Sequence, residues 1–104
     1  MIEKFENVTA ETRANIYFDG KVVSHTIWLE NGDKRTLGIF MPGSYEFGTK
    51  DAEVMNITDG TCEVKLPGGN WEKLKAGETF TVMANSKYSL RCYVPLQYIC
   101  EYVK

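Results

Sequence analysis

The stretch of residues 41–60 constrains the fold more than any other part of the chain. Tyr45 and Phe47 alternate with polar residues near its start, and the alternation resumes after a short polar break. A Pro-Gly dipeptide at 42–43 and an Asp-Gly dipeptide at 59–60 bound the stretch, and both dipeptides are typical of turns. Apolar residues at every second position between turns are characteristic of antiparallel β-strands. The stretch therefore predicts two successive strands.

One charged residue interrupts the apolar face of the second of these strands. Glu53 shares that face with Met55 and Ile57. A carboxylate in this position either lies in water at the end of the strand or is partly buried beside a polar partner, because burying an unpaired charge is costly. Glu53 is therefore a candidate functional group.

The remainder of the chain repeats the pattern in short runs. Residues 21–29 are rich in β-branched side chains, and the Asn-Gly turn at 31–32 predicts a hairpin with 34–41 as its returning strand. Further strands are expected at 61–66, 71–74, 79–83, 88–94 and 97–103. Many short strands separated by turns predict an all-β fold, and a small jelly-roll barrel would leave few exposed strand edges. Residues 1–15 lack this pattern, so we expect an irregular arm there.

Length and composition exclude several classes of protein. A chain of 104 residues corresponds to one domain, which can bury a core without disulfides or metals. The net charge of −2 gives no electrostatic reason to bind a nucleic acid polymer or an anionic membrane. No apolar run approaches the ~20 residues of a membrane helix, and the N-terminus lacks the apolar segment of a signal peptide. Three cysteines without a Cys-x-x-Cys spacing indicate reduced thiols in a cytoplasmic protein.

The central stretch resembles the first sequence motif of the cupins. That motif consists of a Gly, a spacer, His-x-His, a short gap, Glu, six residues and Gly. Gly43 can serve as the first glycine, and Glu53 and Gly60 have the spacing of the end of the motif. The resemblance implies a small jelly-roll barrel of the RmlC-like cupin type.

The positions of the metal-binding histidines of cupins hold other residues here. Phe47 and Thr49 stand where the first motif carries its two histidines. The second motif is suggested by residues 77–88, and its histidine position holds Tyr88. The strand pattern is therefore present while the metal ligands are not, and no metal is expected.

A longer series of segments points to one family of cupins. The segments are YFDGKV at 17–22, GIFMPGSYEF at 38–47, Glu53 and Met55 ahead of Gly60, Leu-Pro at 66–67, AGETF at 76–80 and YICEY at 98–102. Their order and spacing resemble the small single-domain cupins known as pyrimidine/purine nucleoside phosphorylases. The resemblance runs from about Asn15 to the C-terminus, with departures in the loops at 68–70 and 83–85.

The resemblance implies an activity and an assembly. Inorganic phosphate, as co-substrate, would displace the base of a nucleoside and give ribose 1-phosphate and free base, with no metal or other cofactor. Small cupins commonly dimerise through sheet edges or an exchanged N-terminal strand. We therefore expect a homodimer in which the arm at 1–15 contacts the partner and residues 16–104 form the cupin domain.

Phosphorolysis needs groups that bind phosphate, groups that bind the ribose and groups that stabilise the departing base. Glu53 is the candidate for binding the ribose hydroxyls or polarising a neighbour. Tyr45 and Phe47 are candidates for stacking on the base, since every base has a π-face. Tyr88 is a candidate for hydrogen-bonding the substrate. The alternatives are a surface carboxylate for Glu53 and plain core roles for the three aromatic residues.

Phosphate is best held by cationic side chains, hydroxyls or free backbone N–H groups. Thr49 could donate its hydroxyl. Arg91 is the natural phosphate ligand if it points inward, whereas an outward Arg91 would be an exposed partner of Glu101, which is the commoner arrangement. Lys34 and Arg35 follow the Asn-Gly turn and are more typical of a solvated loop end.

Three other classes of function remain open. A non-enzymatic cupin would bind a small molecule in the same cavity without transforming it. A metal-dependent cupin isomerase or dioxygenase is disfavoured, because His25 is the only histidine of the chain. A purely structural dimeric domain is the third.

Overall fold

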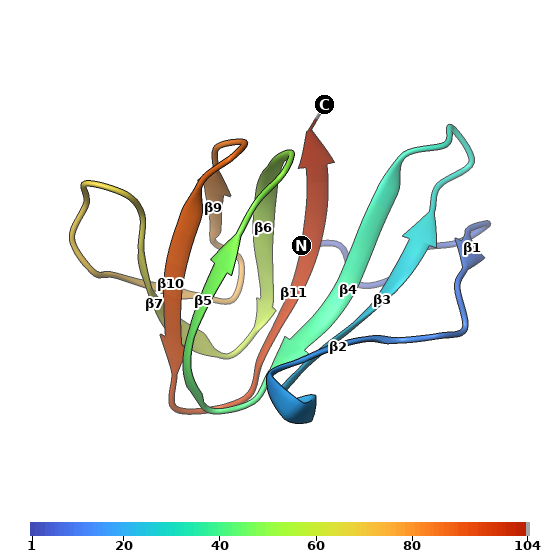
Figure 1. Cartoon of the computed structure of the whole chain (residues 1–104). Coiled ribbons are helices and arrows are strands. Elements are labelled where there is room, and N and C mark those ends of the chain that lie inside the picture. Colours follow the sequence, from blue (N-terminus) through green and yellow to red (C-terminus); the bar gives the residue numbers. More distant parts are fainter. Residues whose placement is uncertain (104) are drawn as a thin grey trace.

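Two antiparallel sheets make up the computed structural model, which describes residues 1–103 (Figure 1). The large sheet has the strand order β1-β3-β4-β11-β6-β9, and β2 pairs with the same edge of β3. The small sheet has the order β5-β10-β7-β8. The strands are β1 (Thr9–Ala10), β2 (Asn15–Tyr17), β3 (Val22–Trp28), β4 (Lys34–Phe40), β5 (Gly43–Gly48), β6 (Ala52–Asp59), β7 (Thr61–Lys65), β8 (Glu72–Lys75), β9 (Thr79–Val82), β10 (Lys87–Cys92) and β11 (Leu96–Val103).

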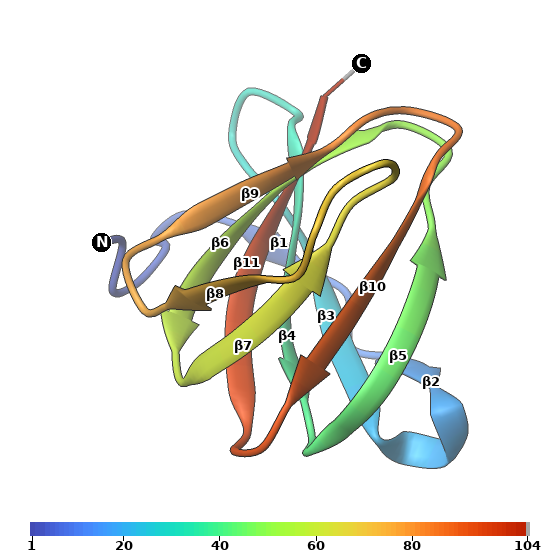
Figure 2. The same ribbon diagram turned by 90° about the vertical axis from the view of Figure 1, so that its left-hand side faces the viewer.

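The sheets face each other across a shared core (Figure 2). Strands that are distant in the chain lie side by side: β11 pairs with β4 and β6, and β10 pairs with β5 and β7. This arrangement is the all-β jelly-roll barrel predicted from the alternating sequence, and its core draws on both sheets. The side chains of Val22, Leu90 and Leu96 are inaccessible to solvent, and full burial of such a side chain contributes about 1.5–3 kcal/mol each.

The predicted strands agree with the observed ones within two residues at their ends. The largest difference is at the end of β10, which stops at Cys92 rather than continuing to residue 94. Tyr93 and Val94 leave the sheet because they belong to the turn that precedes Pro95, and both are exposed. The cysteines are buried free thiols, as expected.

The N-terminal arm is more regular than the sequence suggested. β1 pairs with residues 27–28 of β3, and β2 pairs with residues 22–24 of the same strand. The arm therefore follows the edge of β3 in its own chain. A single turn of 3₁₀ helix, η1 (Phe18–Gly20), then joins β2 to β3.

Candidate functional site

A cavity of about 160 Å³ lies inside the barrel, with walls from both sheets. Its lining combines aromatic rings with a single carboxylate, that of Glu53. No Lys, Arg or His is among the lining residues within the described part of the chain. The inward positions of the alternating strands supply most of the wall, so the period-two pattern of the sequence positions the site directly.

Glu53 is half-buried in this cavity near the start of β6. The thiol of Cys100 on the neighbouring strand β11 donates a weak hydrogen bond to its Oε1 at 3.6 Å. Burial raises the pKa of the Glu53 carboxyl, and the negative charge of Asp51 adds to this, while the Cys100 hydrogen bond and the charge of Lys34 lower the pKa in part. The structure thus has a partly buried carboxylate with a weak partner, and its oxygens can accept stronger hydrogen bonds.

Phe47 and Tyr88 form an aromatic wall opposite the large sheet. Their rings stack with centroids 6.0 Å apart and an angle of 18° between their planes. Phe47↔Tyr88 is also a register pair of β5 and β10. These are two of the three positions at which the resemblance would place histidines, so a flat apolar surface stands where a metal-binding cupin holds its metal.

Hydroxyl groups line the large-sheet side of the cavity. The hydroxyls of Thr36 and Tyr102 lie 3.2 Å apart. Burial raises the pKa of Tyr102 and of Tyr98, although a hydrogen bond between Tyr98 and Ser24 lowers the latter in part. Phenols with raised pKa values stay protonated at neutral pH, so each can donate a hydrogen bond to a bound molecule.

Lys34, which the sequence suggested to be part of a solvated loop end, lies beside the cavity instead. It shares the inward face of β4 with Thr36, and its Nζ lies 4.5 Å from the ring centroid of Tyr102. Lys34 and Asp51 both line an adjoining hollow of about 180 Å³, and Tyr102 belongs to the walls of both spaces. Lys34 and Thr36 are two residues apart on β4 and therefore share one face of the strand, which is the signal that could have identified Lys34 as inward-facing.

Two of the candidates are engaged elsewhere in the fold. Tyr45 lies in the core outside the cavity wall, and its hydroxyl donates to the carbonyl oxygen of Met41 at 2.6 Å. Thr49 donates its hydroxyl to the carbonyl oxygen of Met83 at 2.6 Å and accepts from the backbone N–H of Ser86 at 3.1 Å. The Thr49 hydroxyl therefore ties together two loops instead of facing the cavity.

Arg91 points out of the barrel. Its Nε donates to Oε1 of Glu63 at 2.9 Å, and its guanidinium lies 3.9 Å from the ring centroid of Trp71. The hydrogen bond to Glu63 raises the pKa of Arg91. The expected outward partner was wrong: Glu101 instead pairs with Arg35 at 3.5 Å, because the register places Arg91 opposite Glu63 and Arg35 opposite Glu101.

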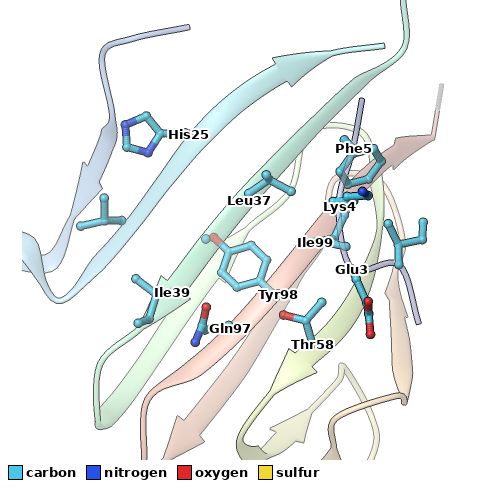
Figure 3. Close-up of a pocket in the computed structure, with 13 residues that line it drawn as sticks. Glu3, Lys4, Phe5, His25, Leu37, Ile39, Thr58, Gln97, Tyr98 and Ile99 are labelled. Carbon is cyan, nitrogen blue, oxygen red and sulfur yellow. The ribbon is translucent and has the colours of Figure 1, made fainter. Parts of the chain in front are cut away.

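A larger hollow of about 510 Å³ lies on the outer face of the large sheet (Figure 3). Figure 3 shows Leu37, Ile39 and Ile99 on the strands, Phe5 on the N-terminal arm, and His25 at the margin. This hollow is mostly apolar, and it lacks the buried carboxylate and aromatic stack of the inner cavity. We therefore place the functional site in the inner cavity, although it is the smaller space.

Within residues 1–103, no three His, Cys, Asp or Glu side chains gather closely enough to hold a metal ion. The same part of the chain contains no helix of the length and hydropathy needed to cross a membrane.

Comparison with known proteins identifies the family. The sequence model described as pyrimidine/purine nucleoside phosphorylase matches residues 12–102. This chain belongs to that family. Proteins named pyrimidine/purine nucleoside phosphorylase from Wolinella succinogenes and Hydrogenovibrio crunogenus are 50% identical over 104 residues and 47% identical over 103 residues. Each match covers at least 98% of this chain and 99% of the relative.

Solved structures confirm the fold of this family member. A crystal structure of a protein of unknown function from Acinetobacter sp. ADP1 matches with a TM-score of 0.93 and 35% identity, over 96% of this chain and 98% of that chain. An RmlC-like cupin from Shewanella frigidimarina matches with a TM-score of 0.70 and 15% identity, over 97% and 93% of the two chains. The cupin barrel and the family expected from the sequence are both confirmed.

Proposed function

We propose that this chain catalyses metal-independent phosphorolysis of nucleosides to ribose 1-phosphate and free base. The observation that carries the proposal is the meeting of a half-buried carboxylate, Glu53, and a stacked aromatic wall in one cavity, with a lysine at its margin. The names of the close relatives support the same activity.

The base is placed against Phe47 and Tyr88. A flat aromatic surface binds purines and pyrimidines alike, because stacking uses the π-face that all bases share. The buried Tyr88 has a pKa raised well above its usual value by burial, so its hydroxyl remains a donor at neutral pH. It can stabilise the negative charge that develops on the departing base.

The ribose is placed at Glu53. Its carboxylate accepts hydrogen bonds from the sugar hydroxyls, and these bonds offset the cost of the partial burial that raises the pKa of Glu53. The hydroxyls of Thr36 and Tyr102 lie on the same large-sheet wall and can add further hydrogen bonds.

Phosphate is placed beside Lys34, at the margin between the cavity and the adjoining hollow. This replaces the sequence-based assignments of Arg91 and Thr49, whose polar atoms bond to Glu63 and to loop backbone. An ammonium group with rotatable donors suits a phosphate dianion, and positioning it beside the sugar removes much of the entropic barrier.

The chemical step balances without a further co-reactant. An oxygen of hydrogenphosphate forms a bond to the anomeric carbon as the bond from that carbon to the base nitrogen breaks. The electron pair of the broken bond stays on the base, which takes up the proton of the hydrogenphosphate. The products are ribose 1-phosphate and neutral base.

The test is the release of base from uridine and adenosine with and without phosphate, in the presence of a metal chelator. We expect phosphate-dependent base release and a ribose 1-phosphate signal in the ³¹P NMR spectrum. Glu53→Gln should lower kcat/KM for the nucleoside strongly. Base release that does not need phosphate, or nucleoside binding without turnover, would instead indicate a hydrolase or a binding protein.

We also propose that the working form is a homodimer in the cytoplasm. Three buried free thiols fit a reducing compartment. Met1 and Ile2 of the arm are exposed apolar residues that a partner could cover. Deletion of the arm should weaken the dimer in sedimentation experiments, and an unchanged dissociation constant would contradict this role.

A further inference from the structure

The two sheets meet along one side of the barrel without a hydrogen-bonded strand pair. β2 lies at an edge of the large sheet and β5 at an edge of the small sheet, and no pairing joins them within the described residues. Aromatic side chains bridge this edge. The ring centroids of Tyr17 and Phe47 lie 5.5 Å apart, and Phe18 lies 5.1 Å from Tyr45 and 5.2 Å from Phe47.

The cavity behind these rings is smaller than a nucleoside site needs. Pockets for drug-sized ligands usually measure roughly 300–1,000 Å³, whereas this cavity measures about 160 Å³. Tyr17 lines the cavity and yet is 45% exposed to solvent. Tyr17 therefore stands at the rim of the cavity, and displacing its side chain would widen the cavity toward solvent.

The backbone of the segment that carries Tyr17 is paired on one side only, so side-chain packing holds its other side. β2 has three residues and, within residues 1–103, pairs with β3 alone, and η1 contains no buried residue. Phe18 and Asp19 have φ angles of +51° and +55°, in the left-handed region. This conformation is uncommon for residues other than glycine, above all for a bulky one. Backbone strain of this kind gathers at ligand clamps and switch regions, and a rearrangement of the turn would relieve it.

We propose that residues 17–20 form a movable flap and that Tyr17 is a base-binding residue of the nucleoside site. The flap moves away from Phe47, the cavity widens, and the base enters between the ring of Tyr17 and the wall formed by Phe47 and Tyr88. This assignment deepens the proposed phosphorylase function and rests on it, and the ligand class is a planar nucleobase.

Three variants test the proposal: Tyr17→Ala, Tyr17→Phe and, as a matched control, Ile16→Ala on the same strand. Ile16 is 65% exposed and does not line the cavity. Tyr17→Ala should raise the KM for uridine and the Kd for free uracil about tenfold, which is within the range for loss of one base–aromatic stack. The KM for phosphate should not change. Tyr17→Phe keeps the aromatic ring and should restore most of the uridine and uracil affinity that Tyr17→Ala loses, whereas Ile16→Ala should stay close to the wild type.

Hydrogen exchange of the wild-type protein gives an independent readout. Amides of residues 16–20 should exchange faster than those of β4 and β11, and saturating uracil should slow them. Unchanged uridine and uracil binding in Tyr17→Ala, or exchange at 16–20 as slow as in the central strands, would overturn the flap. If the wild type shows no phosphate-dependent turnover, the uracil experiments still decide: uracil binding that depends on Tyr17 supports the flap, and absence of uracil binding overturns it.

Discussion

Replacing Lys34 by methionine tests the placement of phosphate. The substitution keeps an unbranched apolar side chain on β4 and removes the positive charge. Because the Lys34 ammonium lies over the ring of Tyr102 at the margin of the cavity, its loss should weaken phosphate binding while leaving the aromatic wall in place. The expected effect is a higher KM for phosphate with little change in the KM for nucleoside.

The size of the effect follows from the position of the charge. A hydrogen bond to a charged group contributes about 1.5–3 kcal/mol, which corresponds to roughly a 10- to 150-fold change in an equilibrium constant. Lys34 is half-buried and shares its hollow with Asp51, so water and the opposing charge reduce its contribution. We therefore expect a rise of about tenfold, at the low end of this range, that shrinks as salt is added.

The assay is the initial rate of base release as phosphate is varied at saturating uridine. Asp51→Asn should have the opposite effect on the KM for phosphate, because removing a negative charge near the phosphate should lower that KM. Arg91→Met provides the control, because Arg91 points outward to Glu63. An unchanged phosphate KM in Lys34→Met together with a raised one in Arg91→Met would refute the placement.

Three further predictions concern stability and the roles of single residues. Burial raises the pKa of Glu53 because it favours the protonated carboxyl. The stability that Glu53 contributes is therefore fully present below the unfolded-state pKa of about 4.3 and is lost as the pH rises through the higher folded-state pKa. Glu53→Gln should therefore raise the free energy of unfolding at neutral pH but not near pH 4, and a denaturant titration at both pH values with equal gains would contradict this. A Cβ at Gly38 would overlap the ring of Tyr98, whereas one at Gly48 would lie 3.7 Å from the carbonyl oxygen of Ser86, an ordinary contact. Gly38→Ala should thus lower the free energy of unfolding by about 1–3 kcal/mol in thermal unfolding, and Gly48→Ala far less. Thr49→Val should cost about 1 kcal/mol through the lost loop hydrogen bonds, and a raised phosphate KM in this variant would restore Thr49 as a ligand.

Strand periodicity predicted the features that depend on local sequence. Alternation around Glu53 identified its apolar face, and the structure places the carboxylate inside the barrel, half-buried, with Cys100 as partner. The same alternation put Tyr45 and Phe47 on one inward face. It could not tell that Tyr45 fills the core while Phe47 lines the cavity, because depth within a barrel depends on strand stagger and twist.

The partners of charged residues could not be predicted in the same way. Arg91 lies on the face opposite Leu90 and Cys92, and the structure decides what the sequence left open, because it buries Leu90 and Cys92 and leaves Arg91 outward. Its partner Glu63 is set by the pairing of β10 with β7, which joins segments 28 residues apart. The alternation of apolar and polar residues predicts which residues share a face of a strand, but it does not predict which strand lies alongside. The residue that stands opposite on that strand is set by the register of the folded sheet. The place of Tyr17 beside the cavity could not be predicted for the same reason, since its contact with Phe47 arises across two sheets.

A crystal structure of the protein with inorganic phosphate and uracil bound is the most direct test of the account. We predict an anion within hydrogen-bonding distance of Lys34 Nζ, and uracil packed against Phe47 and Tyr88 inside the barrel. An anion on the outer face beside Arg91, with uracil in the hollow under the N-terminal arm and the barrel cavity closed, would contradict it.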